Sequence, residues 1–195
     1  MELIKEFFRD LDRGLAPPPD KVRMRIIGSA ALMLQAGYER GTKDSDILEA
    51  ADLAGPVREK LLALAGKGSK LHTKYGLYLD IVGEALPFLP QKPLFHPFVG
   101  LKGLKRCQLS VLDIADVVVS KLKRFNANDV TDIRAVLSRG LLPHARLLER
   151  FRDAVDCYST DARAQDLPRY VGNLNTVERD FFNVPESDIE LPGWV

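Results

Sequence analysis

Residues 22–37 read VRMRIIGSAALMLQAG, and this stretch contains a change from one backbone pattern to another. In residues 22–27 apolar, partly β-branched side chains alternate with two arginines, which predicts a short strand. Residues 30–36 are strong helix formers and are followed by a glycine, which suits a helix end. Gly28 and Ser29 are therefore predicted at a strand-to-helix turn.

Hydrophobic periodicity and turn residues predict the other elements in the same way. Helices are expected at residues 2–13, 56–65, 113–125, 129–138, 143–157 and 166–182, and strands at 44–49, 71–75, 77–82 and 107–112. Residues 86–104 predict a loop with a short strand, and the tail after Pro185 is expected to be irregular. The fold class is α/β (α+β): a small mixed β-sheet core with an N-terminal helix in residues 1–112, then a helical region in residues 113–195.

Composition limits the function classes. The chain has 195 residues and nearly balanced charge, with 28 Lys+Arg against 27 Asp+Glu. This argues against binding nucleic acid by bulk charge, although a local basic patch is compatible with it. The residues that could form such a patch are Lys102, Lys105, Arg106, Lys121, Lys123 and Arg124.

Several other signals are missing from the sequence. The two cysteines and three histidines have no zinc-like spacing, so free thiols and no zinc site are expected. The N-terminus lacks a secretory pattern, and no stretch approaches the roughly 20 apolar residues of a membrane span. A cytoplasmic protein without a membrane partner is expected.

The turn at Gly28 and Ser29 has two interpretations. Glycine lets a phosphate approach the backbone, and a helix N-terminus offers free N–H groups and a positive dipole end. Alternatively, glycine serves a tight turn and serine caps the helix.

Three aspartates carry the chemical argument. On an extended segment Asp44 and Asp46 point to the same face, where their carboxylates can share divalent cations. Asp80 lies inside the apolar run LYLDIV, where a carboxylate is costly unless it is paired or binds metal. The alternatives are a solvated acidic turn for the first pair and a water-facing edge-strand position for Asp80.

The combined pattern resembles the polymerase-β-like nucleotidyltransferase superfamily. Gly28 and Ser29 are followed after fourteen residues by Asp44-Ser45-Asp46-Ile47, and Asp80 matches the family's third carboxylate. The segment RGTKDSD at residues 40–46 is similar to small bacterial members, including abortive-infection toxins of the AbiEii kind. Ser45 departs from the pattern, because an apolar residue is usual between the two acids. Residues 112–132 are similar to the helical segment that follows the catalytic sheet in that group.

The resemblance implies a role for each residue. Gly28 and Ser29 would hold the nucleoside triphosphate, Asp44 and Asp46 would bind Mg²⁺ (or Mn²⁺), and Asp80 would join them and help to deprotonate the attacking hydroxyl.

The flanking polar residues have open alternatives. Arg40 and Thr42 are expected to touch phosphate or to form a structural turn. Lys121 lies on a mostly apolar helix side, so it either extends to water or reaches a buried anion such as phosphate. Asp129 and Asp132 stand near a helix start, where they either cap the helix or contact the nucleotide or Lys121.

The resemblance therefore implies an ATP- or other NTP-dependent nucleotidyltransferase that moves a nucleoside monophosphate to an acceptor hydroxyl. The acceptor is an RNA end such as that of transfer RNA, a protein or a small molecule. A toxin with a cognate antitoxin is one version of this hypothesis. The alternative is a non-catalytic protein of the same fold that acts through a protein partner.

Overall fold

The computed structural model describes residues 2–16, 21–37, 44–48, 53, 55–83, 87–160 and 162–194, without the side chains of residues 44, 45 and 48. The chain divides into two compact units. Unit 1 comprises residues 1–86 and 95–112, and unit 2 comprises residues 87–94 and 113–195.

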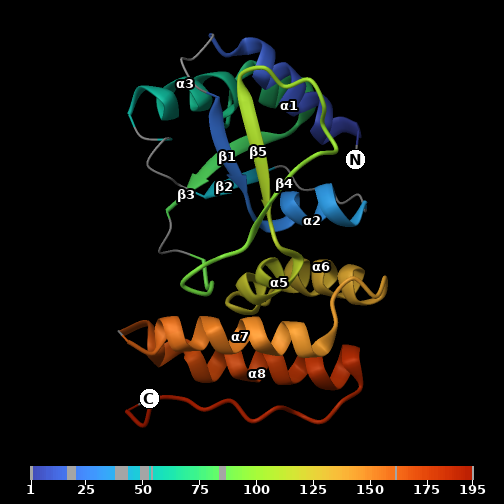
Figure 1. Ribbon diagram of the computed structural model, residues 1–195, viewed down its shortest axis with the longest axis vertical. Coiled ribbons are helices and arrows are strands. Elements are labelled where there is room, and N and C mark those ends of the chain that lie inside the picture. The colour runs from blue at the N-terminus through green and yellow to red at the C-terminus, as the bar shows by residue number, and fades with distance from the viewer. Residues whose placement is uncertain are drawn as a thin grey trace. The chain divides into compact units, whose positions relative to one another are not determined.

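A five-stranded mixed sheet forms the centre of unit 1 (Figure 1). Its strands are β1 (Val22–Ile26), β2 (Asp44–Leu48), β3 (Tyr78–Val82), β4 (Phe95–Pro97) and β5 (Cys107–Leu112), in the order β3-β2-β1-β5-β4. β2 and β3 are parallel, as are β1 and β5. β1 and β2 are antiparallel, as are β4 and β5. The predicted α/β fold with a small mixed sheet is confirmed.

The two faces of the sheet differ in polarity because the strands alternate. In β1 the pattern VRMRI buries Met24 and Ile26 and exposes the two arginines. In β3 Leu79 and Ile81 are buried, whereas Asp80 is exposed. The apolar side chains build a core with the helices, and the opposite face keeps the charged groups.

The helices of unit 1 are α1 (Glu2–Gly14), α2 (Gly28–Ala36), α3 (Pro56–Ala65) and α4 (Lys70–Tyr75). α1 contacts α3 and α4, and α3 also contacts β3. Phe7, Phe8 and Leu11 of α1 are fully buried, as the predicted amphipathic pattern requires. α2 contacts β2 and β5.

The strand predicted at residues 71–75 is wrong, because this segment is helix α4. Ser69 caps the helix by accepting a hydrogen bond from the His72 backbone N–H at 3.1 Å. Gly76 ends it in the left-handed conformation. Local capping at both ends therefore outweighs the short β-like pattern.

Unit 2 is helical, with α5 (Ile114–Leu122), α6 (Ala127–Leu137), α7 (His144–Tyr158) and α8 (Leu167–Val177). A 3₁₀ turn, Ala162–Asp166, precedes α8, and a π-helical turn, Glu178–Phe182, follows it. The tail to residue 194 is irregular, as predicted. Phe88 packs in the core against the rings of Phe151, Tyr158 and Tyr170.

A buried ion pair joins two helices of unit 2. The carboxylate of Asp116 in α5 accepts from Arg150 Nε and Nη2 of α7 at 2.6 and 2.9 Å. The backbone N–H of Leu94 donates to the same carboxylate at 2.8 Å. The fully buried Asp116 is thus supplied with the partners that a buried charge requires.

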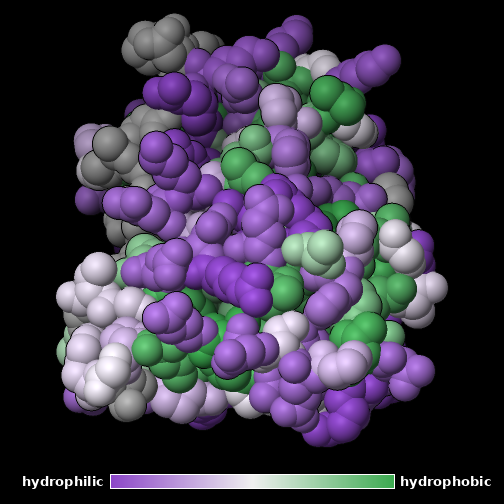
Figure 2. All heavy atoms as spheres, turned by 60° about the horizontal axis from the view of Figure 1, so that its bottom comes forward, coloured by the Kyte–Doolittle hydropathy of each residue, from purple (hydrophilic) through white to green (hydrophobic). Residues whose placement is uncertain are grey.

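Hydrophilic side chains cover most of the face shown in Figure 2, with smaller groups of hydrophobic side chains among them. Over the described residues, no helix has the length and apolar character needed to cross a membrane. Cys107 and Cys157 are free thiols, as expected. Burial, with the nearby charge of Asp12, raises the pKa of the Cys107 thiol to about 12.

Candidate active site

The strand-to-helix turn lies where the sequence predicts it. β1 ends at Ile26, and α2 begins at Gly28, whose φ is +63°. The capping residue is Ile27, and among the described residues no side chain caps the helix. The alternative in which Ser29 is the cap is therefore wrong, because Ser29 lies inside the first turn. The first backbone N–H groups of α2 keep the orientation that binds anions at helix N-termini.

The turn is in direct contact with the second predicted acid. A Cβ atom added to Gly28 would lie 2.9 Å from Asp46 Oδ2, closer than such atoms approach in proteins. The backbone N–H of Ile27 also donates to the carbonyl oxygen of Asp46 at 2.9 Å. Gly28 is thus needed both for its backbone conformation and for the space that the Asp46 carboxylate occupies.

The three acids occupy adjacent positions on two parallel strands. Asp46 in β2 is the register partner of Asp80 in β3, so both side chains leave the sheet on the same face. Asp44 lies two residues before Asp46 in β2 and shares that face by alternation. Neighbouring strands are about 4.8 Å apart, which places the Asp46 and Asp80 backbones within reach of a shared ligand.

The burial argument for Asp80 is wrong. Its side chain is exposed, and β3 forms one edge of the sheet within the observed strand order. The water-facing position that was the alternative for Asp80 is the observed one. The argument for a shared site is therefore the register of Asp80 with the half-buried Asp46, and not a cost of burying Asp80.

Arg25 lies on the same charged face and was not assigned a role from sequence. It is the register partner of Leu48, two residues after Asp46. Its guanidinium carbon lies 5.6 Å from the centre of the Phe95 ring, a cation–π distance. The alternation of arginines in residues 22–26 was the sequence signal that could have pointed to Arg25. Arg40 and Thr42 lie outside the described residues.

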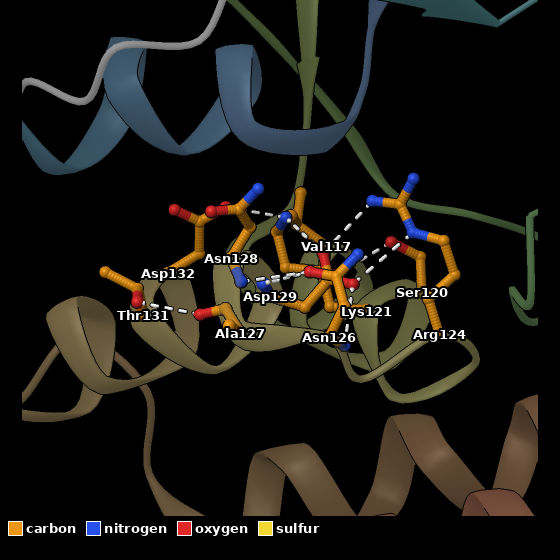
Figure 3. A network of polar contacts seen from close by, with 10 residues as sticks. All are labelled: Val117, Ser120, Lys121, Arg124, Asn126, Ala127, Asn128, Asp129, Thr131 and Asp132. Atoms are coloured by element: carbon orange, nitrogen blue, oxygen red, sulfur yellow. Dashed lines mark hydrogen bonds and ion pairs between the residues drawn. The ribbon is translucent and has the colours of Figure 1, made fainter.

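Lys121 and Asp129 belong to a polar network in unit 2 (Figure 3). The Lys121 side chain is only 3% exposed, and its Nζ lies 3.1 Å from Asp129 Oδ1 and 2.7 Å from Asp132 Oδ2. Both aspartates are fully buried. Arg124 donates to both oxygens of Asp129, from Nη2 at 3.1 Å and from Nε at 3.3 Å.

Asp129 also belongs to a capping box at the start of α6. Its backbone N–H donates to Asn126 Oδ1 at 3.0 Å, and its carboxylate accepts from the Asn126 N–H at 3.4 Å. The two alternatives left open for Asp129, capping and contact with Lys121, are therefore both observed. For Lys121, the buried anions that it reaches are aspartates, and a contact with nucleotide stays a prediction.

The six basic residues singled out in the sequence fall into two groups. Lys102, Lys105 and Arg106 belong to unit 1, whereas Lys121, Lys123 and Arg124 belong to unit 2. Among the described side chains, no cluster of three or more His, Cys, Asp or Glu residues is arranged to hold a metal. The predicted trio stays a prediction, because the carboxylate of Asp44 lies outside the described side chains.

Comparison with known proteins gives one match. A protein-family model described as "Nucleotidyltransferase of unknown function (DUF6036)" matches residues 3–147. No curated protein and no solved structure matches the chain with significance. The matched range contains the glycine turn, the three aspartates and the Lys121 network.

Proposed function

The chain belongs to this nucleotidyltransferase family, and we propose that it transfers a nucleoside monophosphate from a nucleoside triphosphate to an acceptor hydroxyl with Mg²⁺ as cofactor. The observation that carries the proposal is the contact between Gly28 and Asp46, with Asp80 as the register partner of Asp46. A phosphate-binding turn and carboxylates meet at one place, as phosphoryl transfer requires.

The donor atoms of this site suit a divalent metal. Mg²⁺ and Mn²⁺ prefer oxygen ligands and commonly use a few carboxylates together with substrate phosphates. Asp44, Asp46 and Asp80 would hold the ion, and the missing Cβ at Gly28 leaves room for the Asp46 carboxylate. When bound, such an ion neutralises developing charge on the phosphate oxygens.

The chain's own groups supply binding and proton transfer. The amides of the first turn of α2 and the Ser29 hydroxyl hold the triphosphate. The acceptor oxygen attacks the α-phosphorus. The bond between the α-phosphorus and the oxygen that bridges it to the β-phosphorus breaks, and pyrophosphate leaves. The hydroxyl proton passes to the Asp80 carboxylate. Arg25 lies on the same face and offsets the negative charge of the phosphates.

The remaining predicted residues complete the proposal. Arg40 and Thr42 contact phosphate, and Lys121 and Asp129 are the residues of unit 2 that are expected to bind nucleotide. Asp129 and Asp132 hold the Lys121 ammonium in one place, so they are positioning residues for the lysine.

The acceptor and the biological setting extend the proposal. The acceptor is an RNA end such as that of transfer RNA, a protein hydroxyl or a small molecule. The similarity to abortive-infection nucleotidyltransferases suggests a cytoplasmic toxin that a cognate partner protein controls.

The proposal is tested by calorimetric titration of Mg²⁺ with each of the four nucleoside triphosphates. Asp46→Asn should abolish metal-dependent binding, because it removes a charged ligand beside the turn. Asp80→Asn should retain most binding but lose transfer when radiolabelled triphosphate is supplied with candidate acceptors. Glu59→Gln, which changes an exposed acid of α3 in the same unit, is the matched control.

The outcomes separate the alternatives. If Asp46→Asn binds metal and triphosphate as the wild type does and still transfers the nucleotide, this site is not the active site. No binding of any triphosphate by the wild type would favour the non-catalytic protein that acts through a partner.

A further inference from the structure

A basic cavity of about 430 Å³ lies at the opposite end of β1 from the glycine turn. The backbone N–H of Val22, the first residue of β1, donates to the carbonyl oxygen of Arg106 in the cavity wall. Gly28 follows the last residue of the same strand. Four residue steps of about 3.3 Å each separate the two ends of β1, so the cavity and the candidate active site are distinct.

Positive charge dominates the lining of the cavity. Five of its eight lining residues are cationic: Arg9, Arg13, Lys102, Lys105 and Arg106. A chain whose formal net charge is only +1 thus gathers five cations around one concave surface. A concave surface of one sign of charge focuses its field and attracts the opposite ion.

The single acid of the lining offsets only one of the five positive charges, and its carboxylate is engaged by backbone groups. Asp12 is buried, and its carboxylate accepts three backbone N–H groups, from Lys105, Arg106 and Cys107, at 2.8 to 3.1 Å. Both carboxylate oxygens of Asp12 therefore already accept hydrogen bonds from the backbone of residues 105–107. The Arg106 guanidinium also donates to carbonyl oxygens at the end of α1, including that of Asp12 at 3.3 Å, and so fixes the wall of the cavity.

The remaining cations are available to a ligand to different degrees. Lys102 and Lys105 are exposed, and neither ammonium has a partner within the part of the chain that the structure describes. Arg9 pairs with Glu2 at 2.9 Å and also with Glu6, and Arg13 pairs with Asp10 at 2.9 Å, all near the surface. Surface pairs contribute little free energy, so a multivalent anion can compete for these arginines.

We propose that this cavity binds a phosphate-bearing anion at a second site, independent of the transfer reaction. Phosphate carries two charges and several acceptor oxygens, and it therefore matches a group of ammonium and guanidinium donors. The volume lies within the range of ligand pockets, roughly 300 to 1,000 Å³. The phosphate is supplied either by a small free anion or by a polynucleotide strand.

The test is a calorimetric titration of the full chain with inorganic pyrophosphate in the presence of EDTA, which removes metal-dependent binding at the aspartates. A parallel titration uses a 5′-phosphorylated single-stranded oligonucleotide of about 12 nucleotides, a length that covers a typical single-strand site. The variant Lys102→Gln/Lys105→Gln removes the two unpaired charges. The control is Lys67→Gln/Lys70→Gln, which removes two exposed lysines, one in the α3–α4 connection and one at the start of α4.

The Lys102/Lys105 variant should bind about tenfold more weakly, which corresponds to about 1.4 kcal/mol, and the control should bind as the wild type does. A loss for pyrophosphate identifies a small free anion, and a loss confined to the oligonucleotide identifies a strand. Equal binding by all three proteins, or no binding by the wild type, overturns the proposal. Binding of Mg²⁺ with a nucleoside triphosphate should be unchanged in the Lys102/Lys105 variant, which keeps this test separate from that of the transfer reaction.

Discussion

Two separate constraints require glycine at position 28. Its φ of +63° lies in the left-handed region, and its missing Cβ leaves the space next to Asp46 Oδ2. The family resemblance implied that Gly28 and Asp46 belong to one site, and the Asp46 carboxylate does lie next to Gly28. Local patterns left two alternatives open for Asp80, since its exposure depends on the position of β3 at the sheet edge.

Replacing Gly28 by alanine tests the contact with Asp46. We expect Gly28→Ala to lose metal-dependent triphosphate binding, because the new Cβ displaces the Asp46 carboxylate. The matched control is Gly76→Ala, where φ is +67° and, among the described residues, the added Cβ meets no atom within 4 Å apart from its chain neighbours. Both should lose about 1–2 kcal/mol of stability from backbone strain, as measured by urea unfolding. Calorimetry that finds both variants equally competent in binding would contradict the steric argument.

The predictions of individual elements are correct where local signals agree and wrong where these signals compete. The helix over residues 56–65 has the predicted bounds, because Pro56 starts it and a glycine follows it. Residues 70–75 contain β-compatible side chains, but the Ser69 cap and the Gly76 ending decide for a helix. The pairing of α1 with the loop before β5 could not be predicted, because residues about 90 positions apart make it.

That long-range pairing predicts an asymmetry within α1. Asp12→Ala should cost about 2–4 kcal/mol of unfolding free energy, because three backbone N–H groups lose their acceptor and that of Cys107 is buried. Asp10→Ala in the same helix should cost about 1 kcal/mol or less, because Asp10 interacts with Arg13, Lys74 and Tyr75 near the surface. Urea denaturation of both variants measures the difference. Equal losses would show that the Asp12 hydrogen bonds contribute no more than a surface pair.

At the scale of the whole molecule, buried charge is concentrated in unit 2. Asp116, Lys121, Asp129, Asp132 and Arg150 are all buried, and each has an oppositely charged partner. The helices predicted at residues 113–125, 129–138 and 143–157 placed these five residues on helices. They could not predict which charges pair, since Arg150 is contributed by α7, 34 residues after Asp116. Removing one partner of such a pair is therefore expected to be far more damaging than removing an exposed charge.

Acid should destabilise both units, because carboxylates in each have lowered pKa values. Hydrogen bonds from Lys74 and Tyr75 lower the pKa of Asp10 from 3.8 to about 2. For Asp12 and Glu178, burial alone would raise the pKa. Hydrogen bonds from backbone groups to Asp12, and from Ser187 and His144 to Glu178, more than offset this, so the pKa of each is lowered.

A carboxyl whose pKa is lower in the folded state stabilises the fold above its unfolded pKa, and this contribution is lost as pH falls through the folded pKa. The unfolding free energy should therefore be nearly constant from pH 7 to about pH 5 and should fall steadily between about pH 4.5 and pH 2. Asp10→Asn should flatten this decline by about 1 kcal/mol, a value reduced for solvent screening of a partly exposed pair. Urea titrations at a series of pH values measure the decline. Stability that rises on acidification would mean that these carboxylates are not held in their charged form.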